Sequence, residues 1–275
     1  MTPCVKVIIT GFGPFAGVQD NPTQHLCKWL ASEPSVPLRC NVEIIHAETL
    51  CVAAQDVDEW TQNRLCPILE EESGPGCKIL VLHLGVHGSA SCIHLERCAA
   101  NMADFRSPDQ RGCQLLEPIE GSLMQGSTRS TGLDLEVAAS KLSCMGHQVQ
   151  LSCNAGCFLC NWVYFRSLGL CKHSCEVPSQ DQTEELDGHE QRHNPIPLQQ
   201  GHGMTHMNSI CAAKYNSQPA SQSLCRYSSA LRSRNADLHS LFVHVPPFTA
   251  VPEHAQRQCL QDLLLVLSGM LTGRS

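Results

Sequence analysis

No stretch of this sequence is long and apolar enough to cross a membrane as a helix. The longest apolar stretch, Leu260 to Leu271, is interrupted by Gln261, Asp262, Ser268 and Gly269. This pattern is typical of an amphipathic helix. The apolar run near the amino terminus is too short, and too soon followed by glycine, for a secretory signal peptide. We therefore expect no association with a membrane.

The chain also lacks an excess of basic residues. It has 19 Lys and Arg against 26 Asp and Glu, and a formal net charge of −7. Binding to nucleic acid requires clustered positive charge opposite the phosphates, so this composition argues against a nucleic-acid surface. With 42% apolar and 16% charged residues, we expect one large globular domain over residues 1–275.

Cysteine, in contrast, is abundant, with 18 residues. In a short secreted protein this number would predict a framework of disulfides. Here the chain is long, and we expect no signal peptide. We expect free thiols in a reducing cytoplasm.

Strand and helix patterns alternate along the chain. Apolar or β-branched runs predict strands, and apolar residues at helical spacing predict helices. The predicted strands are 5–10, 42–46, 78–86, 148–152 and 241–245, and the predicted helices are 23–31, 52–69, 133–144, one from Cys160 and one at the C-terminal end. Residues 87–125 are less regular. The alternation predicts an α/β fold, a three-layer α/β/α sandwich whose mixed central sheet is mostly parallel.

One segment does not fit this alternation. Residues 171–238 are rich in Ser, Gln, His, Asn and Pro and show no sustained periodicity. We expect a polar, flexible insertion into the domain.

Cys160 stands where a strand pattern gives way to an apolar helix. A helix that begins there would direct its unpaired N–H groups toward the sulfur and favour the thiolate, the reactive form. His244, in the strand near the C-terminal end, is a candidate base, and Glu96 is a candidate carboxylate to orient the imidazole. Taken singly, each residue also fits an ordinary structural role, because free cysteine and strand histidine are common in protein cores.

Several motifs together resemble pyroglutamyl-peptidase I, a family of cysteine peptidases. They are Thr10-Gly11-Phe12-Gly13-Pro14-Phe15 with Asn21-Pro22-Thr23, Gly85-Val86, Glu96-Arg97-Cys98-Ala99-Ala100-Asn101, Asp104-Phe105-Arg106-Ser107-Pro108-Asp109, Asn154-Ala155-Gly156-Cys157-Phe158-Leu159-Cys160-Asn161 and Phe242-Val243-His244-Val245-Pro246. The resemblance covers the predicted core and leaves the insertion outside.

The resemblance implies a phosphorylase/hydrolase-like fold and a triad of Cys160, His244 and Glu96. The implied substrates are small peptides with amino-terminal pyroglutamate. The implied reaction needs no cofactor. Whether the protein forms a homo-oligomer stays open. The residues expected to bind substrate are Phe12, Phe15, Asn21, His87, Arg106 and Phe158. An uncharged lactam needs apolar faces and a few directed hydrogen bonds. Arg106 fits two roles equally, a positive charge near the oxyanion or an ion-pair partner of Asp109.

The chain departs from the family at two places. His244 follows Cys160 at a much longer distance than in relatives, with the polar insertion between them. Loop-closure entropy grows slowly with length, so the insertion need not prevent the site from assembling. His87 stands where relatives carry Gln or a small polar residue, so substrate affinity is expected to differ.

Three other interpretations stay open. Cys153, Cys157 and Cys160 have the spacing of the iron–sulfur ligands in radical S-adenosylmethionine enzymes. Two pairs in the insertion, Cys171 with Cys175 and His189 with His193, approximate the ligand spacing of a zinc finger. The chain would also fit an inactive, binding relative whose pocket the insertion occludes.

Overall fold

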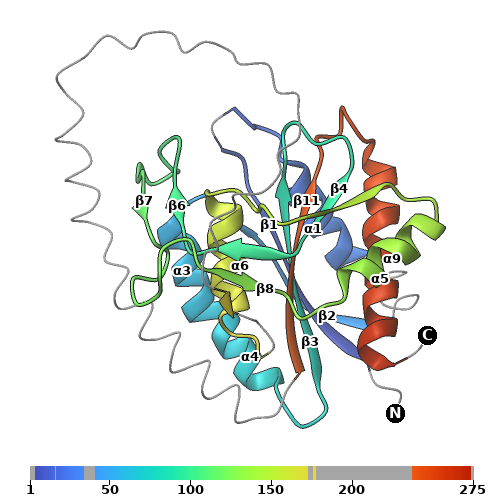
Figure 1. The fold of residues 1–275 in the computed structure, drawn as a ribbon. Helices are drawn as coiled ribbons and strands as arrows, with labels where there is room; N and C mark the ends of the chain where they lie inside the picture. Colours follow the sequence, from blue (N-terminus) through green and yellow to red (C-terminus); the bar gives the residue numbers. More distant parts are fainter. Residues whose placement is uncertain (1–3, 16, 34–40, 173–175, 178–236, 274–275) are drawn as a thin grey trace, which may run out of the picture.

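The computed structural model describes residues 4–15, 17–33, 41–172, 176–177 and 237–273 (Figure 1). Most of the predicted insertion at 171–238 lies outside the described residues. The candidate zinc ligands Cys175, His189 and His193 lie outside them as well.

A six-stranded sheet forms the centre of the molecule. Its strands lie in the order β2 (Val42–Leu50), β1 (Val5–Phe12), β3 (Lys78–Val86), β11 (Asp237–Val245), β4 (Ile93–Glu96) and β9 (Val149–Ser152). Neighbouring strands are parallel except for β11 and β4, which are antiparallel. The predicted mostly parallel mixed sheet is thus confirmed.

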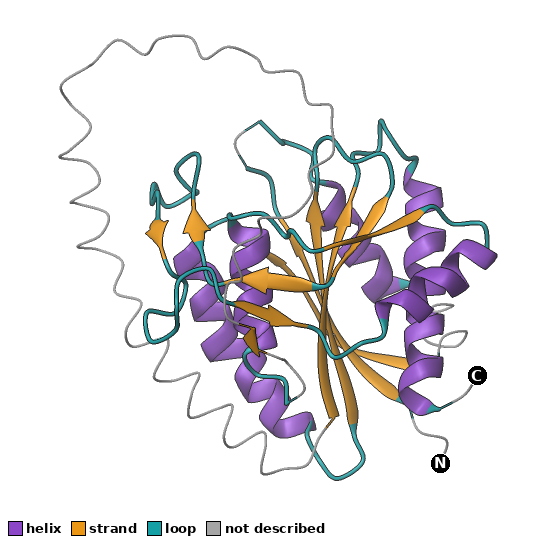
Figure 2. Cartoon of the chain, in the orientation of Figure 1, coloured by secondary structure: helices purple, strands orange, loops and turns teal. Residues whose placement is uncertain are grey.

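Helices cover both faces of this sheet, as Figure 2 shows. Helices α1 (Pro22–Ser32), α5 (Leu135–Cys144) and α9 (Glu253–Thr272) share one apolar core with the sheet, and α3 (Ala54–Trp60), α4 (Cys66–Glu72) and α6 (Leu159–Leu168) share the other. Successive strand side chains point to opposite faces. In β1, Val7 and Ile9 accordingly join the α9 core while Ile8 joins the α6 core. The three-layer architecture follows from this alternation.

In the structure, the helix predicted at 52–69 is interrupted. A π-helical turn, Thr61–Leu65, joins α3 to α4, and the Cys66 N–H donates to the Thr61 carbonyl five residues before it. Pro67 follows at the start of α4. A proline has no N–H to donate to the carbonyl four residues before it. The widened turn ahead of Pro67 replaces the regular α-helical hydrogen bonds with one that spans five residues.

Residues 87–125 contain more strand than the sequence predicts. Besides β4, this region holds β5 (Cys98–Ala100), β6 (Ala103–Asp104) and β7 (Leu116–Glu117). β5 pairs with β8 (Thr128–Ser130), which also pairs with β10 (Glu176–Val177), and β6 pairs with β7. Strands of two to four residues are too short to show a period, which is why the sequence pattern does not reveal them.

In the described ranges, the helices include none with the length and apolarity that spanning a membrane requires.

Candidate active site

The register of three central strands brings the candidate base and carboxylate together. His244 of β11 pairs with Gly85 of β3 on one side and with His94 of β4 on the other, while Phe242 pairs with Glu96. Residues two apart on a strand share a face. Glu96 and His244 are therefore diagonal neighbours on one face of the sheet, within reach of each other.

Glu96 and His244 form a buried hydrogen-bonded pair. The Nδ1 atom of His244 lies 2.7 Å from Oε1 of Glu96, and both side chains are almost fully buried. Burial raises the pKa of Glu96, but the contact with His244, together with the nearby Ser152, outweighs it and leaves the pKa below its ordinary value. The pair therefore favours a carboxylate facing a protonated imidazole.

Cys160 contacts the same imidazole. It is the second residue of α6, whose start at Leu159 lies within one residue of the prediction. Burial lowers the pKa of His244, but hydrogen bonds to Cys160 and Glu96 outweigh it and raise the pKa to about 9. Because Nδ1 faces Glu96, Nε2 is the nitrogen that serves the thiol. The candidate base His244 thus contacts both the candidate nucleophile and the candidate carboxylate.

Gly85 makes room for the sulfur. A Cβ atom at this position would lie 2.9 Å from Sγ of Cys160 and 2.5 Å from Cζ of Phe242. Both contacts are closer than real side chains allow. A glycine inside an apolar strand commonly marks such a close approach, and this is the sequence signal for the residue.

The start of α6 is tied to the chain beside Glu96. The Asn161 side chain donates to the carbonyl groups of Ala100 and Met102, at 2.8 and 2.9 Å, and accepts from the Ala100 N–H at 2.8 Å. The Tyr164 hydroxyl donates to the Glu96 carbonyl at 2.9 Å. These contacts hold the helix that carries the thiol against the strand that carries the carboxylate. For Asn161, the only sequence signal is its place in a family motif.

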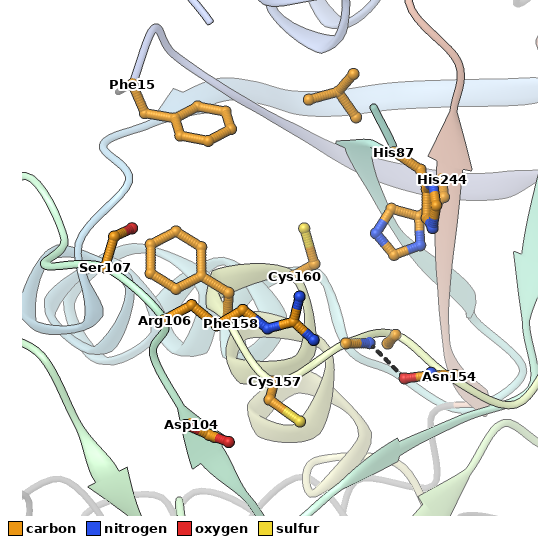
Figure 3. Close-up of a pocket in the computed structure, with 13 residues that line it drawn as sticks. Phe15, His87, Asp104, Arg106, Ser107, Asn154, Cys157, Phe158, Cys160 and His244 are labelled. Carbon is orange, nitrogen blue, oxygen red and sulfur yellow. Dashed lines mark hydrogen bonds between the residues drawn. The ribbon is translucent and has the colours of Figure 1, made fainter. Parts of the chain in front are cut away.

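A cavity of about 520 Å³ opens beside Cys160. Figure 3 shows Phe15 and Phe158 on one side of the thiol and His87 and His244 on the other. The edge-to-face packing of Phe105 on Phe158, with ring centroids 4.6 Å apart, supports that wall. The cavity therefore has one apolar wall and, across the thiol from it, a wall that carries two imidazoles.

The structure brings four of the six expected substrate-binding residues to this cavity. Its walls include Phe15, His87, Arg106 and Phe158. The ring of His87 lies edge-on to that of His244, with centroids 5.6 Å apart. The departure from the family at His87 is therefore in direct contact with the candidate base.

Phe12 and Asn21 lie elsewhere. Phe12 is buried in the core on the α6 side, and its N–H donates to the Thr23 hydroxyl. Asn21 caps α1 and donates to the Gly13 carbonyl at 2.9 Å. Both residues shape the loop after β1, and neither is among the residues that line the cavity.

The structure also separates the two roles considered for Arg106. Asp109 accepts hydrogen bonds from the N–H groups of Ala54, Arg111 and Cys113, at 2.9 to 3.0 Å. Across the described part of the chain, no ion pair joins Arg106 to Asp109. Arg106 lines the cavity instead, as does Asp104.

Among the residues that the structure describes, no group of three or more His, Cys, Asp or Glu side chains is arranged to hold a metal ion. Cys153 and Cys157 are exposed free thiols, and Cys160 is half-buried beside His244.

Comparisons with known proteins agree with this geometry. The family described as pyroglutamyl peptidase matches residues 5–180. The pyrrolidone-carboxylate peptidase of Vibrio vulnificus is 34% identical over 163 residues, which are 58% of this chain and 69% of the relative. That of Thermococcus litoralis is 30% identical over 169 residues, 61% of this chain and 70% of the relative.

The solved structure of the Thermococcus litoralis pyrrolidone carboxyl peptidase matches this fold with a TM-score of 0.64 at 20% sequence identity. The match covers 98% of this chain and 96% of the Thermococcus litoralis chain. This likeness confirms the α/β fold. The family match ends before His244, so the place of this residue rests on the strand register described above. From the match over residues 5–180, the chain belongs to the pyroglutamyl peptidase family.

Proposed function

We propose that this protein is a cysteine peptidase that removes pyroglutamate from the amino terminus of peptides. The observation that carries the proposal is the contact of Cys160 with His244, whose other ring nitrogen is bonded to buried Glu96. Its relatives include proteins named pyrrolidone-carboxylate peptidase and, in Rattus norvegicus, pyroglutamyl-peptidase 1.

Acylation begins at the sulfur. The Cys160 thiolate adds to the carbonyl carbon that joins pyroglutamate to the next residue, and the carbonyl π electrons move to oxygen. When the tetrahedral intermediate collapses, the C–N bond breaks and Nε2 of His244 gives its proton to the leaving amine. Glu96 stabilises the imidazolium and holds its orientation.

Water completes the reaction. Neutral His244 takes one proton from water, and the hydroxide adds to the thioester carbon. The S–C bond then breaks, pyroglutamic acid leaves, and the thiolate and imidazolium are restored. One water is consumed for each peptide bond cleaved.

The lactam ring is proposed to lie between Phe15 and Phe158. These rings supply the apolar faces that a small uncharged group needs, and both line the cavity next to Cys160 (Figure 3). His87 lies on the side of His244, where the leaving amine departs. We therefore expect His87 to affect the residue that follows pyroglutamate more than the ring itself.

The oxyanion requires donors near the sulfur. The backbone N–H of Cys160 lies in the first turn of α6, where N–H groups lack partners within the helix. Arg106, on the cavity wall, is proposed to add positive charge. A reduced thiol is essential to all these steps, which favours a cytoplasmic location.

The test is release of a fluorescent amine from a pyroglutamyl amide in reducing buffer. The wild-type protein is expected to release it, and both Cys160→Ser and prior iodoacetamide treatment are expected to abolish release. Cys144→Ser is the matched control, because Cys144 is an exposed thiol outside the cavity. A prolyl amide, which lacks the lactam carbonyl, should be cleaved poorly.

No turnover by folded wild-type protein would contradict the proposal. If that protein still bound pyroglutamate in a calorimeter, an inactive relative that binds pyroglutamate would be the better interpretation, and no binding would favour an occluded pocket. Equal turnover by Cys160→Ser would exclude this thiol as the nucleophile.

A further inference from the structure

Two cysteines outside the triad meet at the margin of the active site. Cys98 is the first residue of β5, and Cys153 follows the last residue of β9. The Sγ atom of Cys98 lies 3.4 Å from the Cys153 carbonyl oxygen. Cys153 is exposed and Cys98 is half-buried, and both are free thiols. Small reagents can therefore reach the pair from solvent.

The backbone brings these residues close together, with Cys98 one residue beyond the position opposite Cys153. Glu96 of β4 pairs with Ser152 of β9, and the Arg97 N–H donates to the Ser152 carbonyl at 2.7 Å. Neighbouring strands lie about 4.8 Å apart. Disulfides use Cα separations of about 4.4 to 6.8 Å, so adjacent strand ends suit them.

The two thiols also interact with each other. Burial raises the pKa of Cys98 to about 11, and the charge and hydrogen bonding of Cys153 add to this effect. Cys98 is therefore a poor nucleophile at neutral pH, and Cys153 is the thiol that an oxidant meets first because it is exposed.

We propose that Cys98 and Cys153 are a modification site, at which mild oxidation forms an intramolecular disulfide that dithiol reductants reverse. The bond joins the segment that leaves Glu96 to the loop that lines the cavity. Formation of the disulfide does not rest on the proposed peptidase function, because it concerns neither Cys160 nor substrate, whereas its expected effect on turnover does rest on that function.

The oxidant is a low-molecular-weight disulfide such as oxidised glutathione. The Cys153 thiolate attacks one of its sulfurs, forms a mixed disulfide and releases one glutathione thiolate. Cys98 then loses its proton and attacks the Cys153 sulfur, which releases the second glutathione. The protein loses two electrons and two protons, and one oxidised glutathione becomes two reduced ones.

The bond has a consequence for the site. Glu96 stands two residues before Cys98, and Asn154 and Gly156 of the cavity wall follow Cys153. Closing the sulfurs to bonding distance shifts these groups. A small displacement of catalytic groups lowers the rate steeply, so we expect a fall in kcat/KM of about tenfold.

The first experiment uses the full-length Cys160→Ser protein, which cannot form adducts at the nucleophile. It is equilibrated with graded ratios of reduced to oxidised glutathione, alkylated, digested with trypsin without reduction and mapped by fragmentation in a mass spectrometer. The expected product links the peptide Cys98–Arg106 to Cys153, and dithiothreitol removes it.

Matched variants identify the pair. Cys153→Ala, at an exposed position, should abolish the link, and Cys98→Ala should do so too if its thermal unfolding is unchanged. Cys144→Ala should preserve it, because Cys144 lies on the same tryptic peptide as Cys153 but does not contact Cys98. Cys98 that stays alkylatable at every ratio, or that links to another cysteine, would overturn the proposal.

A second experiment measures turnover. Glutathione at Cys160 would inhibit wild type and Cys153→Ala alike, so the difference between them reports the Cys98–Cys153 bond. Extra, dithiothreitol-reversible loss in wild type supports the effect on catalysis. Equal loss in the two proteins overturns that effect, whatever the mass spectra show.

Discussion

Neither Glu96 nor His244 would keep its charge alone in the buried environment that they share. Burial disfavours both charged forms, and their mutual contact restores them. The pKa of His244 rises from 6.5 to about 9. Its contribution to folding stability is therefore complete below about pH 6.5 and is lost as the pH rises through 9. The pKa of Glu96 is lowered, so the dependence on pH is reversed. Its contribution to folding stability is present at neutral pH and is lost as the pH falls through the lowered pKa of this carboxyl.

Replacement of Glu96 by Gln should move the alkaline limit of activity. Without the carboxylate the imidazolium loses its partner, so the fall in kcat/KM near pH 9 should shift to lower pH. The rate itself should fall by roughly 10²- to 10⁴-fold. A pH–rate profile checks both effects. Glu136→Gln, at an exposed glutamate, is the control and should leave the profile unchanged.

Replacement of Gly85 by Ala should disturb the nucleophile directly. The added Cβ meets Phe242 at 2.5 Å and the sulfur of Cys160 at 2.9 Å, so both side chains must move. We expect at least a tenfold loss of kcat/KM and about 1–3 kcal/mol of destabilisation from overpacking. Kinetics and chemical denaturation measure them. Gly88→Ala, where an added Cβ meets nothing within 4 Å, should behave as wild type.

Helix α6 depends on an ion pair beneath it. The Arg166 guanidinium donates to Asp58 of α3 at 2.8 and 2.9 Å, and the Trp162 indole N–H donates to the same carboxylate at 2.8 Å. All three side chains are buried. This ion pair anchors the helix that carries Cys160.

Asp58→Ala should therefore destabilise the protein by roughly 3–5 kcal/mol, because it leaves the buried Arg166 charge without this carboxylate. The free energy of unfolding in urea measures this. Asp56→Ala is the control. Asp56 lies on the same helix, but its carboxylate pairs with exposed Arg111, so its loss should change the urea midpoint of unfolding little. Equal effects of the two substitutions would contradict the importance of burial.

Elements differ in how far their own residues predict them. The sequence predicts β3 with its observed bounds, because a continuous apolar run of this length is typical of a strand that is buried on both faces of a sheet. It does not predict β4, although this strand carries Glu96. β4 has only four residues and is antiparallel to its neighbour β11. Its position in the sheet therefore depends on strands far away in sequence.

Over the whole molecule, thiol reactivity should follow burial. Burial raises the pKa of Cys27 to about 11 and those of Cys66, Cys171 and Cys259 to about 12. At neutral pH a disulfide reagent should label exposed thiols such as Cys144 first. These four thiols should react only as the protein opens. Mass spectrometry of time points checks the order, and early labelling of Cys171 would contradict this core.

Local patterns in the chain are enough to specify the layer architecture, the apolar faces and the candidate nucleophile. These follow from periodicity, from the strand-to-helix junction at Cys160 and from family motifs. The same patterns suggest six substrate-binding residues, of which Phe12 and Asn21 prove to hold the loop and helix after β1.

The meeting of distant residues depends on the folded arrangement. The pairing of β4 with β11 places Glu96 beside His244, the space at Gly85 admits the Cys160 sulfur, and the meeting of β5 with the end of β9 brings Cys98 to Cys153. Local sequence patterns record which face a side chain occupies. They do not record strand order or register, because these are set by how distant segments pack together.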